Sequence, residues 1–71
     1  MDRAQAIAQL PTSYAVALRL RDAAADRETI ARALDIEPEG VPGLLRIGEA
    51  KLAAVLGRYA EQQSERSHRS D

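Results

Sequence analysis

The chain has 71 residues, a formal net charge of −1 and no cysteine, so it forms one small domain at most and has no disulfide or thiolate metal site. It lacks the basic excess that dedicated DNA-binding domains usually carry, and no apolar run approaches the roughly 20 residues that span a bilayer. The start, M-D-R-A-Q, does not have the basic and then apolar order of a signal peptide. We therefore expect a cytoplasmic protein with no membrane partner.

The first predicted elements lie before residue 25. Residues 1–9 are expected to be a short helical or frayed segment with Asp2 near its start, where the helix dipole favours a negative charge. A second helix is predicted from Pro11, which suits a first helical turn. Arg19 and Asp22 on this helix are expected to point to water. No glycine follows the helix to provide a left-handed cap, so its end is not defined by the sequence.

A third helix is predicted from Asp26 to about Leu34. The carboxylate of Asp26 can accept a hydrogen bond from an N–H group of the first turn, and Glu28 adds a favourable charge there. Asp35 then occupies the position where a left-handed residue is needed, a conformation that Asp tolerates better than most residues. The sequence thus predicts a short helix that ends abruptly.

Two prolines and two glycines fall between residues 38 and 43. A helix that began at Pro38 would contain Pro42 as its fifth residue, where the ring clashes with the preceding turn. We therefore predict a turn over residues 38–40 and a final helix from Val41 or Pro42. Gly48 either weakens the middle of this helix or allows another helix to come close. The expected buried stripe consists of Leu44, Leu45, Leu52, Val55, Leu56 and Tyr59.

Residues 61–71 contain no apolar side chain, and we predict a disordered polar tail. The single histidine, His68, lies in this tail without neighbouring metal ligands. The chain has no Ser/His/Asp set, no Gly-rich phosphate loop and no defensible carboxylate pair. The sequence predicts no enzymatic activity, no metal and no cofactor.

Residues 10–56 carry a resemblance to a known family. L-P-T-S-Y-A-V-A-L-R-L-R, I-A-R-A-L-D-I, V-P-G-L-L and A-K-L resemble the corresponding segments of region 4 of bacterial sigma factors, if one residue is dropped near Ala23 to Ala25. The resemblance implies an all-α fold of three to four helices over residues 10–60, built as a helix-turn-helix, in a transcription-related domain that binds promoter DNA. It also implies RNA polymerase, a sigma protein or an anti-sigma protein as candidate partners.

The segment that leads into the final helix departs from this family. Small, polar and basic residues are usual there, whereas this chain has Glu37, Glu39, two prolines and two glycines. Between residues 37 and 59 three cations stand against three carboxylates, one of them Glu49. Basic side chains that could contact DNA phosphates remain at five positions, each of which can equally be a solvated charge: Arg46, Lys51, Arg27, Arg32 and Arg58.

Leu44 and Ile47 point away from the Leu45–Leu52 stripe by helical spacing. They are either part of the core or an exposed apolar patch for a protein partner or a homodimer. The alternative function is therefore a helix-turn-helix that acts as a protein-interaction or dimerisation module without binding DNA.

Overall fold

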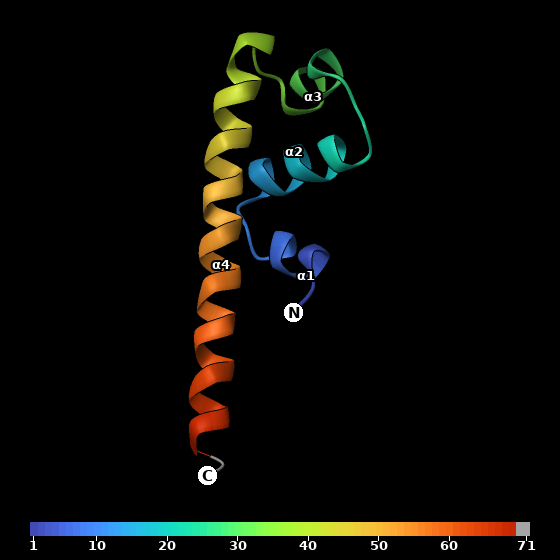
Figure 1. Ribbon diagram of the computed structural model, residues 1–71. Coiled ribbons are helices and arrows are strands. Elements are labelled where there is room, and N and C mark those ends of the chain that lie inside the picture. The colour runs from blue at the N-terminus through green and yellow to red at the C-terminus, as the bar shows by residue number, and fades with distance from the viewer. Residues whose placement is uncertain (70–71) are drawn as a thin grey trace.

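The computed structural model describes the backbone of residues 1–69 and the side chains of residues 1–60. Within these residues the chain is all-α, with α1 (Arg3–Ala8), α2 (Thr12–Asp22), α3 (Arg27–Leu34), a single 3-10 turn η1 (Pro38–Gly40) and α4 (Val41–Arg69). The long α4 forms one side of the molecule, and the three shorter helices pack along its N-terminal half (Figure 1). The all-α prediction is confirmed.

Helix α1 exists because of its cap and its two buried residues. The backbone N–H of Gln5 donates to the Asp2 carboxylate at 2.8 Å, and the backbone N–H of Asp2 donates to the Gln5 side chain at 3.1 Å. This reciprocal capping box satisfies two N–H groups at once. A helix of six residues is not stable alone in water, so the burial of Ala6 and Ile7 has to hold it in place.

Helix α2 ends in a Schellman motif centred on an alanine. Ala24 has a φ of 67°, and its N–H donates to the Arg21 carbonyl at 2.9 Å. The N–H of Ala25 reaches back to the Leu20 carbonyl, also at 2.9 Å. This pair of bonds defines the motif, which normally has glycine at the left-handed position. The left-handed residue here is an alanine, which the composition of the segment did not predict.

The two later helix boundaries agree with the sequence predictions. The N–H of Thr29 donates to the Asp26 carboxylate at 2.8 Å. Hydrogen bonding to Thr29, first to its side chain and then to its backbone N–H, holds the pKa of Asp26 below its usual range. Asp35 is left-handed with a φ of 56°, and the N–H of Ile36 donates to the Ala31 carbonyl. The turn at residues 38–40 and the start of α4 at Val41 were also correctly predicted.

The core consists of two apolar clusters placed one after the other along α4. The first joins α1, α2 and α4, and the second joins α2, α3 and the first turn of α4. Leu45 packs against both clusters. The fully or largely buried members of the first are Ala6, Ile7, Leu10, Ala15, Leu18, Leu52 and Val55, and those of the second are Ala17, Ile30, Ala31 and Val41.

Gly48 is the point of closest approach between α2 and α4. It is buried, and a Cβ at this position would lie 3.5 Å from the side chains of Leu18 and Tyr14. Of the alternatives for Gly48, close approach of another helix describes the structure. Together with Gly48, the residues Val41, Leu45 and Leu52 recur at spacings of four, three and four, which places them on one face of α4.

Helix α4 has 29 residues, which corresponds to about 43 Å, and it continues to Arg69. The prediction of a disordered tail over residues 61–71 differs from this result, since the helix continues nine residues past Ala60. No proline or glycine follows Gly57, and Glu, Gln and Arg are good helix formers, so nothing in the segment stops the helix. His68 and the other side chains of this segment lie outside the described residues, as do residues 70–71. Among the described residues no helix has the length and apolar content that a bilayer span requires.

The alanine at the end of α2 yields a stability prediction. A left-handed non-glycine residue costs about 1–2 kcal/mol, of which the extra freedom of glycine in the unfolded chain would cancel part. We expect Ala24→Gly to raise the free energy of unfolding by about 0.5–1 kcal/mol in urea denaturation.

The matched control is Ala23→Gly, one residue earlier. Ala23 is also exposed but has a φ of −87°, where glycine brings no relief of strain. This variant should be destabilised by about 0.5–1 kcal/mol. Equal effects of the two substitutions would contradict the assignment of strain to Ala24.

Candidate functional site

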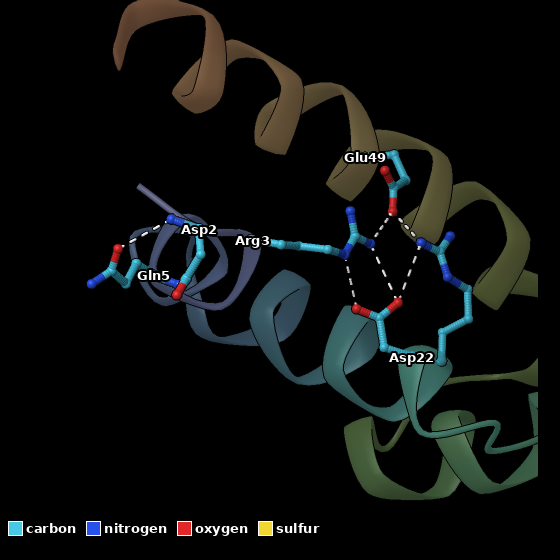
Figure 2. A network of polar contacts seen from close by, with 6 residues as sticks. Asp2, Arg3, Gln5, Asp22 and Glu49 are labelled. Carbon is cyan, nitrogen blue, oxygen red and sulfur yellow. Dashed lines mark hydrogen bonds and ion pairs between the residues drawn. The ribbon is translucent and has the colours of Figure 1, made fainter. Parts of the chain in front are cut away.

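A network of charged side chains joins three helices on one side of the molecule. Arg3 on α1 donates from Nε to Asp22 on α2 at 2.9 Å and from a terminal nitrogen to Glu49 on α4 at 2.8 Å. Arg21 on α2 also pairs with Glu49. Figure 2 shows the Arg3 guanidinium between the two carboxylates, one on either side. The network therefore ties the N-terminal helix to both of its packing partners.

The pKa values of the network follow from these contacts. Hydrogen bonding to Arg3 is the main cause that lowers the pKa of Asp22 and of Glu49, and for Glu49 the bond from Arg21 adds to it. The same bonds, first to Asp22 and then to Glu49, raise the pKa of Arg3. Both carboxylates are therefore charged at neutral pH and accept hydrogen bonds from arginines, which suits a structural role rather than proton transfer.

The network changes the charge of the outer surface of α4. Glu49 is the only acidic residue between positions 41 and 60, and it forms ion pairs with Arg3 and Arg21. Arg46, Lys51 and Arg58 are all exposed on this helix, with Lys51 and Arg58 on one face and Arg46 on another. The balance of three cations against three carboxylates in the linear sequence therefore does not describe this surface, because Glu49 is paired and Glu37 and Glu39 precede the helix.

The structure brings only two of the five predicted DNA-contacting cations to one concave site. Lys51 and Arg58 line a depression between α4 and the turn that joins α1 to α2. The Lys51 ammonium lies 5.4 Å from the centre of the Tyr14 ring, a cation–π distance. The others do not line this depression: Arg46 is exposed elsewhere on α4, and Arg27 and Arg32 are exposed on α3.

Leu44 and Ile47 have different positions, although the sequence treats them together. Leu44 is half-buried and packs against the second core cluster, so the core interpretation describes it. Ile47 is 49% exposed, the large hydrophobic side chain that stands out to solvent among the described residues. Of the two, Ile47 alone is placed to meet a partner without disturbing the core.

Sequence reasoning missed the charged network. Asp22, expected to point to water, pairs with Arg3, and Glu49 was counted as a surface charge. The paired residues lie 19, 28 and 46 positions apart, so no helical spacing within one segment indicates them. Only the packing of α1 against α2 and α4 creates the site.

The lowered carboxylate pKa values make an acid dependence expected. In the unfolded chain Asp and Glu titrate at about 4, so the stabilisation that the charged network gives the folded state is complete above that pH. It is lost as the pH falls through the lower values of the folded state. We expect the melting temperature of the native protein to fall more steeply below about pH 4 than that of Asp22→Asn/Glu49→Gln.

The control for this measurement is Asp35→Asn, which removes one exposed carboxylate outside the network and retains a side chain that tolerates the left-handed conformation. It should keep the steep acid dependence. Parallel melting curves for the native protein and the double variant across the acid range would rule out a stabilising network.

Comparisons of the whole chain with protein-family models, curated proteins and solved structures found no match, so the similarity to sigma region 4 rests on the motifs quoted above.

Proposed function

We propose that this chain is a non-enzymatic helix-turn-helix domain that acts in transcription and binds the DNA backbone through the outer surface of α4. In this proposal α3, the turn η1 and α4 form the helix-turn-helix, and α2 supports it from behind. Its support is the pairing of a short capped helix with a long one across a tight turn, together with the resemblance to sigma region 4.

The observation that carries the proposal is the charge of α4 between residues 41 and 60. Three exposed cations, Arg46, Lys51 and Arg58, share this stretch with a single carboxylate, which is paired inside the charged network. Phosphate contacts of this kind provide most of the affinity of proteins for DNA without reading its sequence. A net charge of −1 for the whole chain is compatible with such a local surface.

The residues in and before the first turn of α4 suit contacts with the DNA backbone better than recognition of DNA bases. Bases are read mainly by donor-bearing side chains near the start of a recognition helix. Here those positions hold Pro42, Gly43 and the half-buried Leu44, and the exposed Glu37 and Glu39 precede them. The binding that we propose therefore depends on charge and has little sequence specificity of its own.

The test is a titration of the protein with a short duplex over a range of salt concentrations. We expect affinity to fall linearly on a log–log plot with a slope that reflects two or more phosphate contacts. Arg46→Gln should reduce the slope by about 1 because one contact is lost.

Arg19→Gln is the control, because it removes the same charge from an exposed position on α2. It should leave the slope unchanged. An absence of any chemical-shift change in the backbone amides of residues 41–51 at about 50 mM salt would exclude DNA binding by this surface.

A second candidate function is supported by the exposed Ile47. It lies on the side of α4 opposite the buried stripe, together with exposed Ala50, Ala54 and Gly57. Small side chains let another helix approach closely, and an exposed isoleucine supplies an apolar anchor. These features favour a protein-interaction or dimerisation module, in which α4 packs against a helix of a partner.

Self-association is tested by sedimentation over rising protein concentration. If Ile47 lies in a dimer interface, the native protein should form dimers and Ile47→Asp should remain monomeric. Ala53→Asp, which adds the same charge at another exposed position of α4, is the control and should still form dimers. A native protein that stays monomeric at about millimolar concentration, far above the Kd of a stable dimer, excludes the homodimer.

A further inference from the structure

We propose that the depression between Lys51 and Arg58 is a binding site for a single phosphate group. The inference deepens the proposed function and rests on it for one of two phosphate sources, the DNA backbone. The other source is a free phosphorylated molecule, which would bind through the same chemistry.

The walls of the depression come from two parts of the chain that are far apart in sequence. Gln9 and Pro11 belong to the turn between α1 and α2, and Lys51, Ala54 and Arg58 belong to α4. Figure 1 shows this turn beside the middle of α4. Leu10 and Val55, which are largely buried members of the first core cluster, also line it. The depression is therefore lined by buried apolar side chains of the core and by exposed polar ones.

The charge of the lining residues selects an anion. Lys51 and Arg58 both line the depression, and no carboxylate of residues 1–60 does. They are seven residues apart on α4, two turns on the same face, or about 10.5 Å along the helix axis. Two long cationic side chains at that spacing can approach one phosphate from opposite sides.

Two further features of the start of α2 favour a phosphate at this position. The ring of Tyr14 lies 5.4 Å from the Lys51 ammonium, which gives this flexible side chain a preferred position above the start of α2. Pro11 stands at the N-cap of α2 and offers no side-chain acceptor, so its side chain does not cap the first N–H groups of that helix. Their partial positive charge adds to the field of the two cations.

The size of the site limits what can occupy it. Its volume is about 290 Å³, and it is open to solvent on one side. Sites for whole small molecules usually span about 300–1,000 Å³ and enclose most of the ligand. The depression has a volume at the lower end of this range but does not enclose its contents, so it suits a phosphate group whose remaining molecule stays in solvent, as in a nucleic acid strand.

The experiment follows backbone amide chemical shifts during titration with inorganic pyrophosphate, and separately with a short duplex. Pyrophosphate should cause saturable shifts in residues 12–14 and 51–58. In Lys51→Gln/Arg58→Gln these shifts should be lost, and the salt slope for the duplex should fall by about 1, because the two side chains share one phosphate. The control pair Arg46→Gln/Arg19→Gln removes the same charge outside the depression and should keep the pyrophosphate shifts.

The outcomes separate this inference from the proposed function. Binding of both ligands, each dependent on Lys51 and Arg58, supports the site and assigns it to the DNA backbone. Pyrophosphate binding without duplex binding supports the site, assigns it to a free phosphorylated molecule and overturns DNA binding. Duplex binding that does not depend on Lys51 and Arg58 overturns the site alone. Equal loss of pyrophosphate shifts in both double variants, or no saturable shift in the native protein, also overturns it.

Discussion

The close contact of α2 with α4 at Gly48 is the constraint on which the rest of the structure depends. Because Gly48 has no side chain, Leu18 and Tyr14 can lie directly against the α4 backbone. That approach lets Leu18 and Leu52 become fully buried within a small core of aliphatic residues. It also sets the start of α2 beside the middle of α4, which creates both the depression and the position of Tyr14 under Lys51.

The charged network forms where α1, α2 and α4 pack together, so the packing of the helices determines which surface charges are paired. Asp22 and Glu49 are held by Arg3 and Arg21, so two acidic residues that a linear count assigns to solvent do not oppose the cations of α4. The individual ion pairs are partly exposed and contribute little to stability each. Their effect on which charges remain free is larger than their effect on the fold.

The sequence predicts local structure well here because local residues determine it. Asp26, Asp35 and Pro38 each act within one helical turn, and the structure has the cap, the left-handed end and the turn where they were expected. Ala24 was not predicted as left-handed, because an alanine adopts this conformation only when the surrounding packing requires it. Gly48 left two alternatives open, and the contact with Leu18 decides between them.

The candidate site was much less predictable. Lys51 and Arg58 were identified as cations, but their shared depression depends on where the turn between α1 and α2 lies. The pairing of Arg3 with Glu49 joins residues 46 positions apart and leaves no periodic signal. Leu44 and Ile47 differ because Leu44 lies on the side of α4 that packs against the second cluster, and spacing within one helix does not show where that cluster lies.

The division of the core into two clusters has a consequence for the native-state motions of the molecule. The cluster that contains α1 and the cluster that contains α3 share only the half-buried Leu45 among the described side chains. Separate apolar units of this kind open with different free energies. The N-terminal end can therefore open while α3 stays docked, and α3 can open while α1 stays docked, so amide protons of the two helices exchange with solvent through separate openings.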